Sequence, residues 1–114
     1  MKIPAEKSLG EETLALHLKA HKIGFNREVV FAKGHKFKFD FEIVPPGRRE
    51  TFGVEIDGGN FNGGHSRGKA YEQFCRKINL ANSLGWTVYR FTTAMVVSGE
   101  AINTILAALG METK

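Results

Sequence analysis

Apolar residues recur at helical spacing near the start of the chain. Leu14 and Leu18 lie four residues apart, which places them on one face of a helix. The pattern predicts a helix over about residues 9–23. Gly24 follows it and is the residue type that commonly ends a helix.

Two further stretches predict helices. Over about residues 69–84, apolar and aromatic residues recur every three or four positions, and Gly85 supplies a stop. A last helical segment is predicted over about residues 94–109, and Gly99 divides it.

Alternating apolar and polar residues predict strands between these helices. The clearest alternation, KFKFDFEIV, predicts one face made of Phe37, Phe39, Phe41 and Ile43 and another made of Lys36, Lys38, Asp40 and Glu42. Lys33-Gly34-His35 predicts the turn before it, and Pro45-Pro46-Gly47 ends it. The four predicted strands cover Arg27–Ala32, Lys36–Val44, Thr51–Asp57 and Trp86–Phe91.

The order of these elements predicts the fold class. Helix, three strands, helix, strand and helix indicate an α/β protein of one domain, with a mixed four-stranded sheet flanked by helices. The second and third strands are expected to be antiparallel. The third and fourth, joined through a helix, are expected to be parallel with a right-handed crossover.

Composition narrows the class of protein only slightly. The chain has 114 residues, 42% hydrophobic and 25% charged, which is typical of a globular domain. No apolar stretch approaches the roughly 18 residues that a membrane span needs. The single cysteine, Cys75, fits a reducing cytoplasm. A formal charge of +4 permits binding to a polyanion without requiring it.

Acidic residues gather where the third predicted strand ends, in the stretch VEIDGGNFNGGH. Glu55 and Asp57 lie two residues apart and therefore share one face of the strand. Asp40 neighbours one of them if the second and third strands pair. Carboxylates at that range are relieved by a hard cation such as Mg²⁺, which accepts few protein ligands and keeps positions for water and phosphate oxygens. The alternative is a solvated sheet face on which Lys36 and Lys38 pair with the acids.

Four segments in order resemble the PD-(D/E)XK nuclease superfamily: FKFDF, GVEIDGG, GHSRG and RKINLANSLGWTVYRFT. More narrowly, they are similar to small endonuclease-like proteins of bacteriophages and prophages, whose relatives include very-short-patch-repair-type endonucleases. The resemblance covers roughly residues 8–109. It implies a restriction-endonuclease-like fold over residues 1–114 and a magnesium-dependent endonuclease, with Mn²⁺ as a substitute.

The resemblance assigns roles to individual residues. Asp40 matches the metal-binding aspartate of the family and Glu55 its second acid, while Glu11 matches a helix glutamate. The superfamily usually has a lysine two residues after the second acid, where this chain has Asp57. Lys77 or His65, which also fall on family positions, would then supply the positive charge.

Two alternatives to a metal-site role for Glu11 stay open. Ser8 and Glu11 have the spacing of a capping box, in which Glu11 would only satisfy a backbone amide at the helix start. Glu12 is the alternative helix acid, since it shares a face with Leu9 and Leu16.

The loop from Gly58 to Gly68 contains most of the expected DNA contacts. Its glycines allow backbone amides to approach a phosphate chain closely. Asn60 and Asn62 are predicted to enter a groove, and Arg67 and Lys38 to contact phosphates. The alternative is a flexible connector.

These features predict a metal-dependent DNA endonuclease in the cytoplasm of a bacterial host. The phage resemblance implies branched or nicked DNA as substrate, in recombination or packaging, and a homodimer would place two sites on opposed strands. The alternative is a non-catalytic nucleic-acid-binding accessory module of a phage replication or recombination complex.

Overall fold

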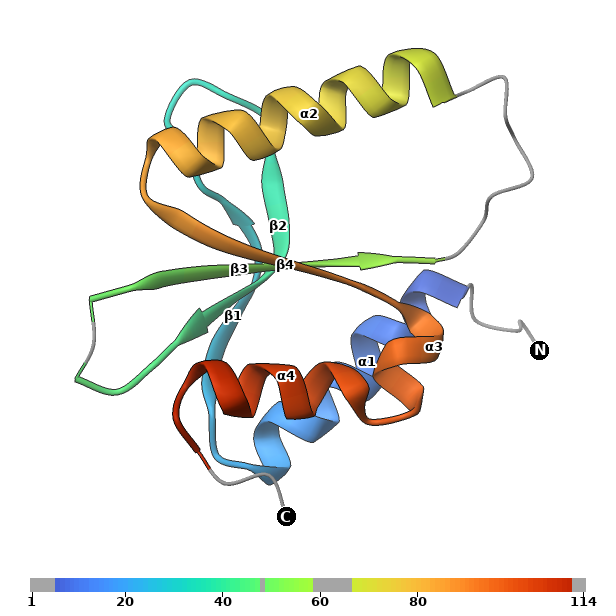
Figure 1. Cartoon of the computed structure of the whole chain (residues 1–114), viewed down its shortest axis with the longest axis vertical. Coiled ribbons are helices and arrows are strands. Elements are labelled where there is room, and N and C mark those ends of the chain that lie inside the picture. The colour runs from blue at the N-terminus through green and yellow to red at the C-terminus, as the bar shows by residue number, and fades with distance from the viewer. Residues whose placement is uncertain (1–5, 48, 59–66, 112–114) are drawn as a thin grey trace.

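A mixed four-stranded sheet runs through the centre of the molecule (Figure 1). The structure, a computed structural model, describes residues 6–47, 49–58 and 67–111. The strands lie in the spatial order β1-β2-β3-β4, with the bounds Gly24–Val30, Lys38–Val44, Thr51–Asp57 and Trp86–Thr92. β1 and β3 run antiparallel to β2, and β4 runs parallel to β3. This arrangement confirms the predicted mixed sheet.

Helices cover both faces of the sheet. α1 (Glu6–Ala20), α3 (Thr93–Val97) and α4 (Glu100–Ala108) lie on one face, and α2 (Arg67–Ser83) lies on the other (Figure 1). α2 follows β3 and precedes the parallel strand β4, as the crossover prediction requires. Gly99, with a φ of 92°, separates α3 from α4 and confirms the predicted division.

The main hydrophobic core lies between the sheet and the three helices on one face. Leu14 and Leu18 of α1 are completely buried in it, whereas Leu9 and Leu16 are exposed. The sheet and α4 contribute Phe41, Ile43, Val54, Ile56, Ile102, Ile105 and Leu106. Glu11 shares the helix face of Leu14 and Leu18. The packing of these leucines therefore turns Glu11 toward the sheet.

The start of α1 differs from the prediction. The helix begins at Glu6, so Ser8 and Glu11 both lie inside it. They cannot form a capping box at its start, because the backbone amides that need capping belong to the first turn. The capping interpretation of Glu11 is therefore wrong.

The end of α1 is set by a residue other than the predicted glycine. Lys22 adopts a left-handed φ of 58°. Its amide donates to the carbonyl of Lys19 at 3.0 Å, and the Ile23 amide donates to the carbonyl of Leu18 at 2.9 Å. These two bonds form the Schellman pattern of a helix end. Gly24 instead begins β1.

The first hairpin also has shifted boundaries. β1 begins and ends earlier than the predicted Arg27–Ala32. Its first residue, Gly24, pairs with the last residue of β2, and its last residue is Val30. β2 begins at Lys38, two residues after the predicted start. The turn predicted at Lys33 and Gly34 is present, and Gly34 has a φ of 83°.

Phe39 lies on the opposite face of the sheet from Phe41 and Ile43, contrary to the alternation. A side chain at Gly53, whose Cβ direction is opposite to that of the core residue Val54, would meet the Phe39 ring at 2.5 Å. The ring instead stacks on Phe31, with centroids 4.3 Å apart. This change of face coincides with the end of the regular ladder of β2 with β3, which covers only residues 41–43, so that β2 separates from β3 before Phe41.

Candidate metal and active site

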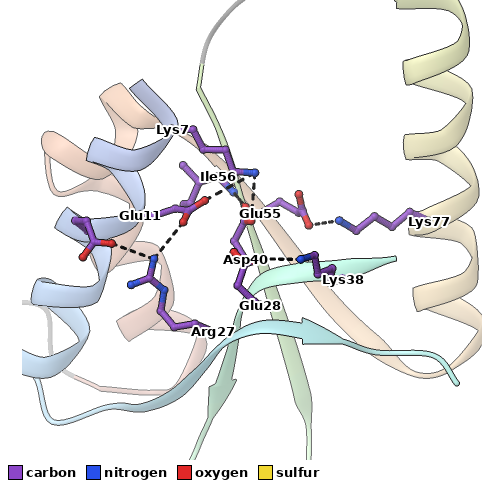
Figure 2. A network of polar contacts seen from close by, with 10 residues as sticks. Lys7, Glu11, Arg27, Glu28, Lys38, Asp40, Glu55, Ile56 and Lys77 are labelled. Atoms are coloured by element: carbon purple, nitrogen blue, oxygen red, sulfur yellow. Dashed lines mark hydrogen bonds and ion pairs between the residues drawn. The ribbon is translucent and has the colours of Figure 1, made fainter. Parts of the chain in front are cut away.

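Acidic side chains from one helix and three strands converge where β2 separates from β3 (Figure 2). Glu11 comes from α1, Glu28 from β1, Asp40 from β2 and Glu55 from β3. We call these four residues the acid cluster. Glu11, Glu28 and Asp40 each offer a carboxylate oxygen, and these oxygens lie within 4.8 Å of one another. Elements far apart in the sequence thus bring several negative charges together.

Asp40 lies at the centre of the acid cluster and is 7% exposed. Its Oδ2 accepts a hydrogen bond from the backbone amide of Ile56 at 2.7 Å. Its Oδ1 lies 3.2 Å from the Nζ of Lys7, in the first turn of α1. One oxygen of this carboxylate therefore takes the place of a strand partner for the Ile56 amide, and the other oxygen faces the ammonium group of Lys7.

Glu11 reaches the cluster from α1, and its side chain is 14% exposed, compared with 67% for Glu12. Its carboxylate lies 3.1 Å from Arg27 and 3.8 Å from Lys7. Burial raises the pKa of Glu11, and the charge of Asp40 raises it further, while Lys7 and Arg27 act in the opposite direction. The structure therefore favours Glu11 over Glu12 as the inward acid of the helix.

Glu55 extends toward α2 and forms an ion pair with Lys77 (Figure 2). Both side chains are nearly buried. Burial raises the pKa of Glu55, Lys77 lowers it, and Asp40 raises it, so that the pKa ends above its ordinary value. Lys77 thus lies where it can hold Glu55 in its ionised form and supply a positive charge to the cluster.

Lys7 and Arg27 complete the charge distribution on the α1 side. For each, burial lowers the pKa, but attraction to carboxylates outweighs it and the pKa rises overall. Asp40 is the carboxylate that raises the pKa of Lys7 most, and Glu12 is the one that raises the pKa of Arg27 most. Both side chains therefore stay protonated in the cluster.

Glu28 is a member of the cluster that the sequence analysis missed. It adopts a left-handed φ of 55°, which is rare for a residue with a side chain. Its carboxylate lies 3.0 Å from the Nζ of Lys38, and the hydrogen bond from that lysine lowers its pKa. Lys38, predicted to contact phosphate, thus pairs with an acid of the cluster.

The position of the hairpin turn is a signal that could have identified Glu28. The hairpin pairs residues that are equally far from Gly34, such as Val29 with Phe39 and Arg27 with Phe41. Glu28 therefore lies opposite Asp40. Pairing the two strands across the predicted turn Lys33-Gly34-His35, which has Gly34 at its centre, would have predicted this neighbour before the structure was known.

Asp57 has a different environment from the one expected. Its Oδ2 lies 2.9 Å from Arg90 on the neighbouring strand β4, and the Arg90 guanidinium lies 4.0 Å from the ring centroid of Phe74 on α2. The predicted trio was Asp40, Glu55 and Asp57. Within the described residues, the acids that come within ligand distance of one another are instead Glu11, Glu28 and Asp40.

The remaining predicted site residues belong to the glycine-rich segment. Asn60, Asn62 and His65 lie outside the described residues, as does the side chain of Arg67, the first residue of α2. Their roles stay predictions.

The donor chemistry of the acid cluster fits a hard divalent cation. All four side chains offer only carboxylate oxygens, which are the ligands that Mg²⁺ and Mn²⁺ prefer. Three of them already converge without nitrogen or sulfur donors. Asp40 and Glu55, the predicted metal ligands, lie on β2 and β3 next to this group.

An open pocket of about 480 Å³ lies apart from the cluster, between α2 and β4. It is lined by Cys75 and Asn79 of α2 and by Arg90 of β4, together with apolar side chains. Asn79 therefore lines this pocket and does not lie with the acids of the cluster.

Among the described residues, no helix combines the length and the apolarity that crossing a bilayer requires. No protein-family model matches the sequence, and a search of curated proteins finds none with significant similarity.

Proposed function

We propose that the chain is a magnesium-dependent DNA endonuclease that hydrolyses phosphodiester bonds. The observation that supports this is the acid cluster itself. Bringing buried and half-buried carboxylates together costs free energy unless a cation neutralises their charges. Here α1, β1, β2 and β3 all contribute one, at the point where two strands separate and leave backbone groups that Asp40 must satisfy.

Asp40 and Glu55 would hold the ion, and Glu11 and Glu28 would assist. A bound divalent ion supplies positive charge that polarises a phosphoryl oxygen and makes water a stronger acid. Asp40 is fixed by the Ile56 amide, so one of its oxygens keeps a set position. Such preorganisation lets the site favour the transition state over the ground state.

Lys77 would replace the lysine that the superfamily has two residues after its second acid. It pairs with Glu55 from α2, on the side of the cluster opposite α1 (Figure 2). Asp57, which stands at the usual lysine position, pairs with Arg90. The positive charge next to the second acid is thus supplied by a helix and not by β3.

The proposed substrates are branched or nicked DNA in phage recombination or packaging, in the cytoplasm of a bacterial host. The net charge of +4 suits an anionic substrate. A homodimer would set two sites against opposed strands.

The test is cleavage of nicked, branched and linear DNA by the purified protein, with Mg²⁺ or with EDTA. We expect cleavage only with Mg²⁺, and none from Asp40→Asn or Glu55→Gln. Glu100→Gln, which makes the same acid-to-amide change at an exposed residue of α4 outside the cluster, is the matched control and should cleave normally. Full activity of either acid variant would contradict the proposal.

One observation favours the accessory-module alternative. Each acid of the cluster already has a cationic partner: Lys7 for Asp40, Arg27 for Glu11, Lys38 for Glu28 and Lys77 for Glu55. A cluster neutralised in this way can be stable without metal. DNA binding that EDTA does not change, with no cleavage of any substrate, would support this second function.

A further inference from the structure

Lys7 occupies the acid cluster in the manner of a bound cation. Its Nζ lies 3.2 Å from Asp40 Oδ1 and 3.8 Å from Glu11 Oε2. It therefore bridges two of the three carboxylates whose oxygens converge (Figure 2). An ammonium group in this place neutralises the same oxygens that a divalent ion would need.

The backbone of Lys7 is held in place by close packing against the end of β3. A Cβ added at Gly58 would lie 3.1 Å from the backbone nitrogen of Lys7. The first turn of α1 and the residue after β3 thus approach each other closely, and glycine permits this. The start of the Lys7 side chain is fixed beside the cluster, while its ammonium group hangs from a flexible four-carbon stem.

Among the cations that pair with Asp40, Glu11 or Glu55, Lys7 is also the one that can leave most readily. Arg27 is held by Glu11 and Glu12 and lies 5.0 Å from the ring centroid of Phe41. Lys77 is nearly buried and lies 5.2 Å from the ring centroid of Phe39. The Lys7 side chain is 47% exposed, so its ammonium group can turn into water without crossing the protein interior.

We propose that Lys7 is the resident counter-ion of the acid cluster and that a divalent ion must displace it from Asp40 and Glu11. The proposal rests on the metal-dependent function proposed above. Two cations cannot share the same carboxylate oxygens without strong repulsion. Lys7 therefore sets how much free Mg²⁺ or Mn²⁺ is needed to load the site, and it keeps the acids neutralised when the ion is absent.

The test is calorimetric titration of the purified protein with MnCl₂. Lys7→Met removes the charge and keeps the length of the side chain, and we expect it to tighten the Mn²⁺ dissociation constant by about tenfold, or about 1.4 kcal/mol. Lys7→Arg keeps the charge and should bind Mn²⁺ as the wild type does. Lys19→Met removes an exposed lysine from the same helix and should also leave the affinity unchanged.

The outcomes separate this proposal from the proposed function. Equal affinity of wild type and Lys7→Met, or weaker binding by the variant, overturns the role of Lys7 but leaves the metal site intact. Binding by Lys7→Met alone supports both proposals. Absence of Mn²⁺ binding in every protein overturns both. Thermal unfolding with and without MnCl₂ gives an independent readout, in which the melting temperature of Lys7→Met should rise more than that of the wild type.

Discussion

The carboxylate of Asp40 hydrogen-bonds the backbone amide of Ile56, with 2.7 Å between Oδ2 and the amide nitrogen. This bond lies just beyond the end of the ladder between β2 and β3, whose last pair is Phe41 with Val54. The side chain therefore satisfies a buried amide that would otherwise lack a strand partner. The same carboxylate faces Lys7 with its other oxygen, so Asp40 joins the structure of the sheet to the chemistry of the acid cluster.

Two substitutions at Asp40 should separate these roles. Asp40→Asn retains an oxygen that can accept from Ile56, whereas Asp40→Ala leaves that amide unsatisfied. We expect Asp40→Ala to lower the free energy of unfolding by about 1–3 kcal/mol more than Asp40→Asn does. Urea unfolding in EDTA measures the difference. Equal stability of the two variants would show that the Ile56 bond contributes nothing.

Glu11→Gln should stabilise the metal-free protein at neutral pH. The raised pKa of Glu11 means that its ionised form is less favourable in the folded state than in the unfolded chain. Its contribution to stability is therefore most favourable below the unfolded pKa of about 4.3 and is lost as the pH rises through the folded pKa. We therefore expect Glu11→Gln to unfold at a higher urea concentration than the wild type at pH 7.

The pH dependence gives the control for this prediction. The advantage of Glu11→Gln should disappear below about pH 4, where the wild-type carboxyl is protonated in both states. Urea unfolding between pH 3.5 and 7, in EDTA, measures it. A variant that is less stable than the wild type at pH 7 would show that the pairs with Arg27 and Lys7 outweigh the cost of burial and repulsion.

The sequence predicted the sheet and its helices because each depends on a local pattern. The alternation of KFKFDFEIV, the spacing of Leu14 and Leu18 and the glycines near helix ends are all visible within a short window. The parallel pairing of β3 with β4 followed from the helix between them. Asp40 was likewise predicted to neighbour either Glu55 or Asp57, because consecutive strands usually pair.

The features that the sequence analysis missed depend on departures from regular geometry. Lys22 and Glu28 adopt left-handed conformations that their residue types do not suggest. Phe39 lies on the other face of the sheet at the point where β2 leaves β3, which alternation alone cannot reveal. The role of Lys7 as partner of Asp40 depends on where α1 meets the end of β3, a contact between segments far apart in the sequence.

Gly10 tests how closely α1 must approach the sheet. A Cβ at this position would lie 2.8 Å from Oγ1 of Thr93 and 2.9 Å from Cγ2 of Ile56. Replacing a helical glycine by alanine normally stabilises by up to about 1 kcal/mol, but overpacking costs about 1–3 kcal/mol. We therefore expect Gly10→Ala to lower the melting temperature.

Gly68→Ala is the matched control for this substitution. Gly68 lies in the first turn of α2, and an added Cβ would meet no atom within 4 Å. Its melting temperature should stay the same or rise. If Gly10→Ala is as stable as Gly68→Ala, α1 can move away from Ile56 and the position of Glu11 is not fixed by this contact.

The pair of Glu55 and Lys77 should show strong energetic coupling. Both side chains are nearly buried, so each single substitution, Glu55→Gln or Lys77→Met, leaves one charge in a poorly solvated place without its partner. The double variant removes both charges together. We therefore expect its loss of stability to be smaller than the sum of the two single losses, by about 0.5–3 kcal/mol.

Urea unfolding of the four proteins at pH 7 in EDTA completes this double-mutant cycle. Lys69, exposed near the start of α2, provides the control, because Lys69→Met should add to Glu55→Gln without coupling. Lys77→Met should also raise the pKa of Glu55 further, because Lys77 is the main partner that lowers it. Additive behaviour of Glu55→Gln and Lys77→Met would mean that solvent screens this ion pair, and Lys77 could then not serve as the positive charge held against the second acid.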